Sequence, residues 1–209
     1  AELVHLKSLV SLGLENTEVT DEGLKVVGTM LGLRSLNLRR CSNVTNDGLA
    51  HLGTLENLEQ LHLLYTNLGD EGVAHLVSLR KLKLVDGRGC VLITDAGVEH
   101  LAPLGSLRSL KFRNPQVGDE ALSHIRVIKG LTSLFLEDTA ITEEGVAHIS
   151  GLVKLRELNL FRTGVTDKGL ASLGRMHDLK RLVLRDTSLA CLLYTSPSPR
   201  DGLLSRMAS

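Results

Sequence analysis

Apolar and polar positions alternate in a pattern that repeats along most of the chain. The frame Leu-x-x-Leu-x-Leu, with Phe once in the last place, occurs eight times. Successive frames start 24, 25, 21, 28, 24, 24 and 24 residues apart. Their first residues are Leu9, Leu33, Leu58, Leu79, Leu107, Leu131, Leu155 and Leu179. Because an apolar residue at every second place is the period of a half-buried strand, each frame predicts a short β-strand.

A second signature follows the frames and predicts a short helix. It reads TEVTDEGL after the first frame and TGVTDKGL after the seventh, and the copy after the fifth is degenerate, PQVGDEAL. Thr and Asp suit a helix start, because their oxygens accept from free N–H groups and Asp complements the helix dipole. Gly in the first turn forms helix poorly, so we expect it to allow close approach of the neighbouring unit. One such unit cannot bury its own apolar face, and the units must stack.

These frames resemble the leucine-rich repeat family over residues 1 to about 189. The stretches CSNVTNDGLAHL and TGVTDKGLASL are similar to its cysteine-containing, ribonuclease-inhibitor-like subclass, which is common in F-box ubiquitin-ligase subunits. The resemblance implies an α/β fold, a horseshoe-shaped leucine-rich repeat solenoid. A parallel sheet of about eight strands would line its concave side, and short helices its convex side.

Both ends of the chain depart from the repeat. LVHL at residues 3–6 matches LAHL at residues 49–52, so we expect the chain to begin inside the helix of an earlier unit. Residues 1–189 would then be a repeat array truncated at both ends, and residues 190–209 a non-native or disordered tail. The stretch from Cys191 resembles a translated sequencing adapter; the alternative is a natural Ser/Pro-rich tail. In either case the prolines cannot continue a helix.

Composition narrows the classes of partner. The 209 residues include 24 basic and 24 acidic ones, which gives no electrostatic reason to expect nucleic acid or an anionic membrane as partner. No apolar run approaches the roughly 18 residues that cross a bilayer. Aromatic residues make up 2% of the chain, so the core must be aliphatic. No catalytic triad, phosphate-binding glycine loop or pair of acids stands out. We therefore predict no enzyme activity and no cofactor.

Histidine recurs at one helical position of the repeat. Adjacent helices pack about 8–10 Å apart, whereas zinc binds its ligands at about 2 Å. We therefore interpret the row as a duplicated surface position and predict no metal site. Its members are His51, His75, His100, His124 and His148.

Cysteine replaces threonine at one turn position in two units. Cys41 and Cys90 lie two units apart, a separation of roughly 10 Å at about 4.8 Å per strand. This separation exceeds the limit of about 7 Å for a disulfide. We interpret both as buried structural thiols that bond the backbone of a neighbouring turn, and they favour a reducing, cytoplasmic location.

Residues between the core leucines point to the opposite side of the sheet and should form three exposed columns. Two features of these columns favour a binding surface. Lys83 and Lys111 would be neighbours of like charge, which an acidic partner would relieve. Phe135 and Phe161 would be exposed beside arginines, a composition typical of binding hot spots. The predicted partner-binding residues are Lys81, Lys83, Lys111, Arg113, Phe135, Phe161, His62 and Arg185.

A loop enlarged at Val85–Gly89 would account for the 28-residue step and protrude from the rim; whether it binds anything stays open. The predicted function is a monomeric protein-interaction scaffold that binds a protein or peptide with acidic and apolar groups. The family resemblance implies a more specific function, the substrate-recognition arm of an F-box-type ubiquitin-ligase adaptor. The alternatives are a regulatory or targeting region of a larger kinase or hydrolase, and a receptor or effector fragment.

Overall fold

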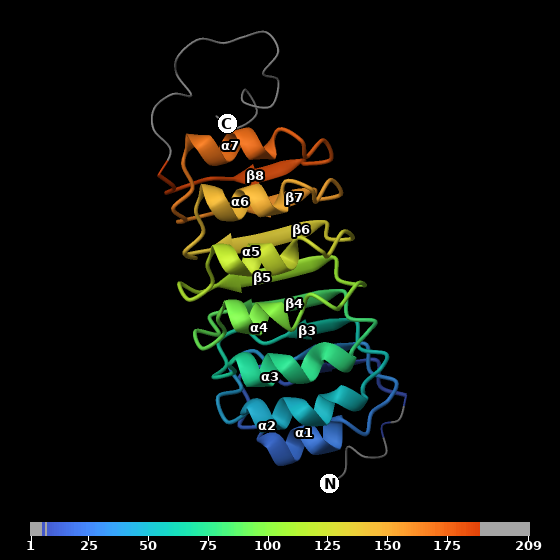
Figure 1. Ribbon diagram of the computed structural model, residues 1–209. Helices are drawn as coiled ribbons and strands as arrows, with labels where there is room; N and C mark the ends of the chain where they lie inside the picture. The colour runs from blue at the N-terminus through green and yellow to red at the C-terminus, as the bar shows by residue number, and fades with distance from the viewer. Residues whose placement is uncertain (1–5, 7, 189–209) are drawn as a thin grey trace.

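The structure, a computed structural model, describes residue 6 and residues 8–188. In this part of the chain eight parallel strands form one open sheet, in which each strand pairs with the next along the sequence. Figure 1 shows the units stacked in an elongated array with α1 and β8 at opposite ends. The strands are β1 (Ser11–Gly13), β2 (Ser35–Asn37), β3 (Gln60–His62), β4 (Leu84–Arg88), β5 (Ser109–Arg113), β6 (Ser133–Glu137), β7 (Glu157–Asn159) and β8 (Arg181–Val183).

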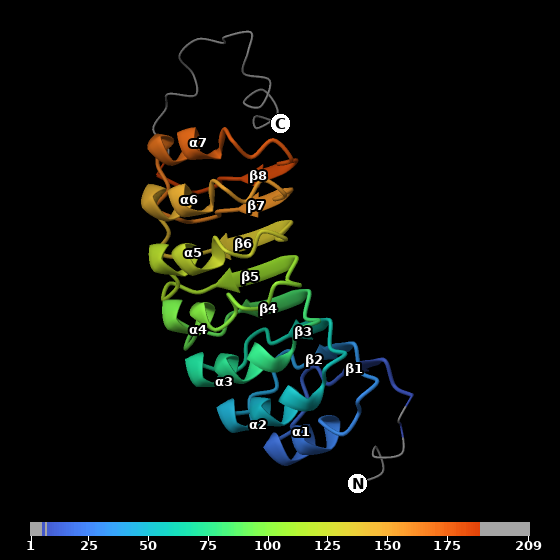
Figure 2. The same cartoon turned by 45° about the vertical axis from the view of Figure 1, so that its right-hand side comes forward.

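A short helix follows each of the first seven strands and covers the other side of the sheet. Figure 2 shows the strands along the inner side of the curved array and the helices along its outer side, as the sequence predicts. Two of the helices, α2 and α3, continue as 3-10 turns, η2 (His51–Thr54) and η3 (His75–Ser78). The helices are α1 (Asp21–Val27), α2 (Asn46–Ala50), α3 (Asp70–Ala74), α4 (Asp95–Glu99), α5 (Asp119–Ile125), α6 (Glu143–Ile149) and α7 (Asp167–Leu173).

The core between sheet and helices is continuous and almost entirely aliphatic. The three frame residues of the second unit, Leu33, Leu36 and Leu38, are completely buried, and the same holds in the third unit. The frame residues of the first and last units are only partly buried. Each interior unit therefore buries its apolar face against two neighbours, which is the packing expected of a stacked repeat.

The fourth unit differs from the sequence prediction. The strand register pairs Leu61 with Val85, so the frame of this unit begins at Leu82 and not at Leu79. With this frame all units are 24 or 25 residues apart. The predicted enlarged loop 85–89 is therefore wrong, because its first four residues belong to β4. Val85, predicted to be exposed, is 1% exposed and lies in the core.

The same shift corrects two of the predicted site residues. The places assigned to Lys81 and Lys83 on the inner face are taken in register by Leu84 and Asp86. Both lysines lie before β4, on the edge of the array where a helix leads back to a strand. The predicted like-charge contact between Lys83 and Lys111 is therefore wrong, and Asp86 is the strand neighbour of Lys111.

Gly87 explains why the pattern misleads at this point. It occupies the place of the third frame leucine, and Phe112 of the next strand fills the space that its missing side chain leaves. A Cβ on Gly87 would lie 3.0 Å from the Phe112 Cε1, and Phe112 is completely buried. The fourth unit therefore lacks an apolar side chain at its third frame position, and the ring that fills this space belongs to the fifth unit. The overlapping frame Leu79, Leu82, Leu84 then matches the leucine pattern better than the true frame, which begins at Leu82.

The two predicted structural cysteines are free and buried, which confirms that part of the prediction. The Cys41 thiol donates to the Leu14 carbonyl at 2.9 Å, and the Cys90 thiol donates to the Leu63 carbonyl at 3.0 Å. Each thiol thus ties its turn to the strand of the preceding unit. Burial raises the pKa of Cys90 above its ordinary value. In the degenerate fifth unit the buried Asn114 replaces the cysteine or threonine of the other units. Its side-chain amide donates to two backbone carbonyls of the preceding unit.

A second tie joins the helix starts of neighbouring units. The acid that opens a helix accepts from both the backbone N–H and the hydroxyl of the threonine before the next helix. These bonds are 2.6–2.9 Å long and occur in three pairs, Asp21–Thr45, Asp70–Thr94 and Asp119–Thr142. The glycine of the first turn fits against this acid, since a Cβ on Gly97 would collide with Asp70 Oδ1. This contact confirms the expectation that the glycine allows close approach.

The predicted helix at residues 3–6 lies outside the described residues except for Leu6, which is in no helix, and the predicted tail over residues 190–209 lies wholly outside them. Among the helices that are described, none is both long enough and apolar enough to cross a membrane.

Candidate functional site

The inner face of the sheet carries three columns of side chains between the core positions. The strand register and its flanking backbone hydrogen bonds define them. The first column is Ser11, Ser35, Gln60, Leu84, Ser109, Ser133, Glu157 and Arg181. The second is Gly13, Asn37, His62, Asp86, Lys111, Phe135, Asn159 and Val183. The third is Glu15, Arg39, Leu64, Arg88, Arg113, Glu137, Phe161 and Arg185.

An ion pair that the sequence did not reveal lies in the middle of this face. Arg88 donates to Asp86 through two nitrogens, at 2.9 and 2.8 Å, and the Asp86 side chain is only 2% exposed. This bidentate bond holds the Asp86 charge on β4 between His62 and Lys111 of the neighbouring strands. The alternation Leu-Val-Asp-Gly-Arg, together with a spacing of 24 residues from the third unit, is the signal that would have found it.

Towards β8 the inner face carries two aromatic rings, as the sequence predicts. Phe135 on β6 and Phe161 just after β7 are both half-buried. The Lys111 ammonium lies 5.3 Å from the centre of the Phe135 ring. The guanidinium groups of Arg162 and Arg185 lie 4.9 and 5.9 Å from the Phe161 ring. All three distances fall within the range of cation–π attraction, so the rings and cations form one patch. We call Lys111, Phe135, Phe161 and Arg185 the aromatic patch.

Acidic side chains neutralise part of this surface. Arg113 Nε lies 2.7 Å from Asp138 Oδ2. Arg162 lies 3.6 Å from both Asp138 and Asp186, so the four charges alternate across successive units. Arg113, predicted to bind a partner, is thus already paired. Lys111 and Arg185 form no salt bridge within residues 8–188, and the same holds for Arg39 and Arg181 farther along the face. An acidic partner can therefore reach the two cations that lie beside the rings.

A tyrosine on the rim was also missed. Tyr65 is 45% exposed and lies just after the third column, at the position where most units adopt a left-handed backbone conformation. The Arg40 guanidinium of the preceding unit lies 5.5 Å from its ring centre. Gly89 makes room on the other side, because a Cβ there would collide with the ring. The sequence could have indicated this tyrosine, because Tyr65 occupies the repeat position one residue beyond the third column.

His62 should titrate below its ordinary pKa of 6.5. Burial lowers the pKa of His62, Asp86 raises it, and Lys111 lowers it. Replacing Lys111 with glutamine should therefore raise the pKa, and Asp86→Asn should lower it further. Because the folded state binds fewer protons here, the contribution of neutral His62 to stability is present above about pH 6.5 and is lost as the pH falls through the lowered pKa. NMR of the imidazole carbon resonances measures the midpoint, and shifts in the opposite directions would contradict this electrostatic arrangement.

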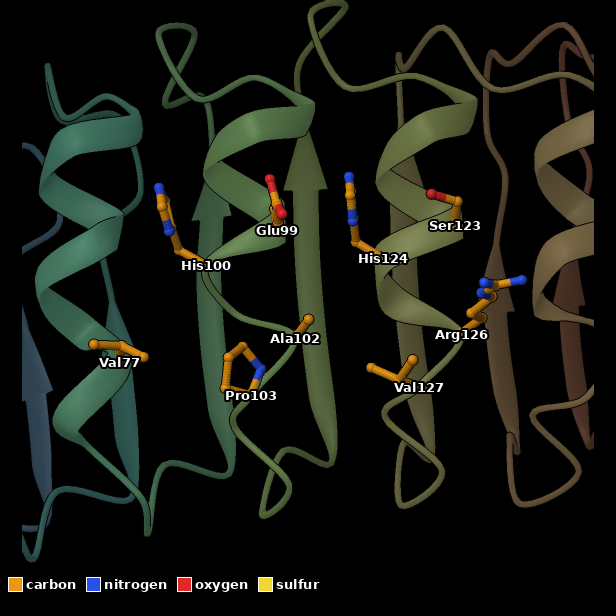
Figure 3. A pocket seen from close by; sticks show the side chains of 9 residues that line it. All are labelled: Val77, Glu99, His100, Ala102, Pro103, Ser123, His124, Arg126 and Val127. Atoms are coloured by element: carbon orange, nitrogen blue, oxygen red, sulfur yellow. The ribbon is translucent and has the colours of Figure 1, made fainter.

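The histidine row lies on the outer face, as expected of a surface position. His100 and His124 line an open depression of about 590 Å³ between α4 and α5, together with Val77, Glu99, Pro103 and Val127 (Figure 3). In Figure 3 their rings stand on separate helices and do not converge on a common point. No group of three or more His, Cys, Asp or Glu side chains suited to a metal ion occurs within the described residues.

Two segments of the chain match a family profile described as "Leucine Rich repeat", at residues 54–77 and 152–174. No curated protein matches the chain. Among solved structures, two internalins of Listeria monocytogenes, inlF and inlC2, are each 22% identical and superpose with TM-scores of 0.66 and 0.61. The alignments cover 90% and 87% of this chain, and 58% and 80% of the internalin chains.

A plant peptide hormone receptor, RGFR1 in complex with RGF2, is 15% identical with a TM-score of 0.58. The match covers 88% of this chain but only 33% of the receptor. The chain thus spans little more than half of the inlF chain and a third of the receptor chain. At these identities the likeness concerns the fold. The parallel strand order, the outer helices and the matched repeats together identify the chain as a leucine-rich repeat solenoid.

Proposed function

We propose that this solenoid is a binding scaffold whose aromatic patch on the inner face holds a protein or peptide partner with acidic and apolar groups. One observation carries the proposal: two phenylalanine rings lie on the solvent side of the sheet, each beside a cation, in a chain with only three phenylalanines. Aromatic anchors beside charged groups are the usual centres of binding energy in interfaces. The mechanism is binding to a rigid surface and involves no covalent chemistry.

The arrangement defines what the partner should offer. Apolar side chains would cover the edges of Phe135 and Phe161, and carboxylates would approach Lys111 and Arg185. The ion pair of the buried Asp86 and the half-buried Arg88 would present a nearly neutral border beside Lys111. The structure of the plant receptor, which is a complex with RGF2, supports a peptide as one occupant of this fold.

Selection of peptides from a random displayed library on the full chain tests this proposal. Enriched peptides should combine Asp or Glu with Leu, Ile or Phe. The double variant Phe135→Ser, Phe161→Ser should weaken their binding about a thousandfold, because each lost anchor is worth about 2 kcal/mol. Lys111→Glu should weaken it about tenfold and reduce its salt dependence. Biolayer interferometry gives the dissociation constants.

The matched control changes two apolar residues that are equally available but lie outside the patch. Val91 and Leu92, between β4 and α4, are 57% and 56% exposed. Val91→Ser with Leu92→Ser should leave the dissociation constants within about twofold of the parent chain. Equal binding of the peptides to the parent chain and to the double phenylalanine variant, or no enrichment at all, would refute binding at the aromatic patch.

A narrower proposal is that the chain is the substrate-recognition arm of an F-box-type ubiquitin-ligase adaptor in the cytoplasm. Support comes from the resemblance of the Cys-bearing repeats, and from two buried free thiols that suit a reducing compartment. The transcript sequence upstream of Ala1 distinguishes this proposal from its rivals. An F-box would support it, whereas a kinase or hydrolase domain, or a signal peptide, would replace it with one of the alternatives.

A further inference from the structure

The edge of the array where helices lead back to strands is strongly basic in the last three units. The connecting segments 126–132, 150–156 and 174–180 each carry two exposed cations, and among all three Asp178 is the one acid. We call these six cations the basic edge. They are Arg126, Lys129, Lys154, Arg156, Arg175 and Lys180.

The cations of the basic edge are left without counter-charges. Within the described residues none of them forms a salt bridge or donates a side-chain hydrogen bond. Lys129 also reaches across to the next unit: a Cβ on Gly151 would lie 3.5 Å from the Lys129 Nζ, so this ammonium lies against the connection that carries Lys154 and Arg156. The Arg108 guanidinium lies against Gly130 in the same way and extends the edge towards β5. Rows of like charge at this spacing repel unless an anion lies between them.

The repeat itself does not require this arrangement. In the third unit the corresponding segment carries two acids, Glu56 and Glu59. Glu59 lies 2.6 Å from the Lys83 Nζ and 3.4 Å from the Arg34 guanidinium. Its hydrogen bond with Lys83 lowers the pKa of Glu59 below the ordinary value. Glu59 thus neutralises Arg34 and Lys83 within the chain. Arg80 and Lys81 of the fourth unit donate instead to the Pro103 carbonyl and to the Asn57 side-chain oxygen. The last three units differ in that their six cations have neither an acidic partner nor a side-chain hydrogen bond within the described residues.

Exposed apolar side chains accompany these cations. Val127 and Val153 are 56% and 52% exposed and lie in the same segments. Arg126 and Val127 also border the depression of the outer face (Figure 3). The three segments contain no Phe, Tyr or Trp on which nucleic-acid bases would stack. Cations interleaved with aliphatic side chains suit an acidic peptide segment better than a nucleic acid.

We propose that the basic edge docks an acidic segment of a protein partner, with its carboxylates against the six cations and its apolar side chains against Val127 and Val153. This surface is separate from the aromatic patch, and its occupant can be bound whether or not the inner face is filled.

Fluorescence anisotropy with a labelled short peptide of repeating Glu-Ser-Glu-Val tests the proposal on the full chain at low salt. The parent chain should bind it with an affinity that falls steeply as salt is added. Lys154→Glu with Lys180→Glu should weaken binding about tenfold. The matched control, Lys25→Glu with Lys168→Glu, makes the same change of charge on exposed helix positions and should weaken it less than about twofold. Circular dichroism checks that each variant is folded.

Two further arms separate this surface from its rivals. Phe135→Ser with Phe161→Ser should leave the affinity for this peptide unchanged, so failure of the inner-face proposal would not affect this one. A single-stranded oligonucleotide of thymidines should bind more weakly than the peptide. Equal losses in the two lysine double variants, no binding by the parent chain, or tighter binding of the oligonucleotide would each overturn the assignment of the basic edge to an acidic protein segment.

Discussion

Replacing Phe112 with alanine should lower the free energy of unfolding by about 3–5 kcal/mol. The ring is completely buried at the middle of the array and fills space left by the glycine of the preceding unit. Its removal leaves a cavity that two neighbouring strands cannot close without breaking their register. Because a stacked repeat is held by interfaces between neighbours, the loss should also weaken the cooperativity between its halves. Urea unfolding followed by far-ultraviolet circular dichroism measures both the midpoint and the slope.

Phe161→Ala is the matched control. It removes the same ring from a half-buried position on the inner face, and should lower the free energy of unfolding by less than about 1.5 kcal/mol. Hydrogen exchange in the Phe112 variant should show the largest loss of protection in β4 and β5. Similar destabilisation by the two substitutions would mean that Phe112 is not the residue that closes the core beside β4.

The pairing of Phe112 with Gly87 can be tested as a double-mutant cycle. Gly87→Ala places a Cβ 3.0 Å from the Phe112 ring, so it should destabilise the parent chain by about 1–2 kcal/mol. In a Phe112→Leu background the same methyl group should fit and stabilise the chain instead. A coupling energy of about 1 kcal/mol or more between the two sites is expected. Additive effects would contradict the complementarity of the two side chains.

The pair of Gly87 and Phe112 also shows which strand frames can be predicted from the sequence and which cannot. Seven of the eight frames could be read from leucine spacing, because a buried aliphatic residue at each frame position is required by two neighbouring units. The fourth frame could not, since Gly87 carries no apolar signal and the compensating ring belongs to another unit. A constraint of equal spacing between units would have corrected it. Once the frame is wrong, every exposed residue of that unit is misplaced, as happened with Lys81 and Lys83.

The candidate sites were predictable to different degrees. Phe135 and Phe161 follow from strand alternation alone, because their own frames are regular. The ion pair of Asp86 and Arg88 depends on the corrected register. The basic edge is hidden by composition, since equal numbers of acids and bases in the whole chain say nothing about their separation in space. Here the acids collect at the helix starts, where the dipole and the threonine ties favour them.

Replacing Asp70 with alanine should lower the free energy of unfolding by about 2–4 kcal/mol. The carboxylate accepts two hydrogen bonds at 2.7 Å, from the Thr94 N–H and from its hydroxyl. Hydrogen bonds to a charged acceptor contribute about 1.5–3 kcal/mol each, and solvent around the half-buried Asp70 reduces the sum of the two. Asp47→Ala is the control, because Asp47 lies in the first helical turn of α2 but is exposed and accepts no bond from the next unit. It should cost less than about 1 kcal/mol, the range of a dipole interaction at the surface. Equal costs would mean that the tie between units adds nothing beyond the dipole.

The tie is reduced to its backbone bond at Gly69 and Gly118, which carry no hydroxyl. It is lost altogether between α6 and α7, and restoring it there should stabilise the protein. The helix α6 opens with Glu143 where other units have Asp or Asn. The hydroxyl of Thr166 in the next unit is the one buried side-chain oxygen or nitrogen in residues 8–188 without a hydrogen-bond partner. Glutamate is longer by one methylene group, which carries its carboxylate past this hydroxyl.

Glu143→Asp should therefore raise the free energy of unfolding by about 1 kcal/mol, the net value of a hydrogen bond gained together with relief of an unsatisfied group. Glu144→Asp is the same chemical change at the adjacent, exposed position and should have an effect within about 0.5 kcal/mol of zero. In a Thr166→Val background, which removes the hydroxyl, most of the gain from Glu143→Asp should disappear. A gain that persists there would trace the stabilisation to the helix end itself, and would show that the acid at this position does not join the sixth unit to the seventh.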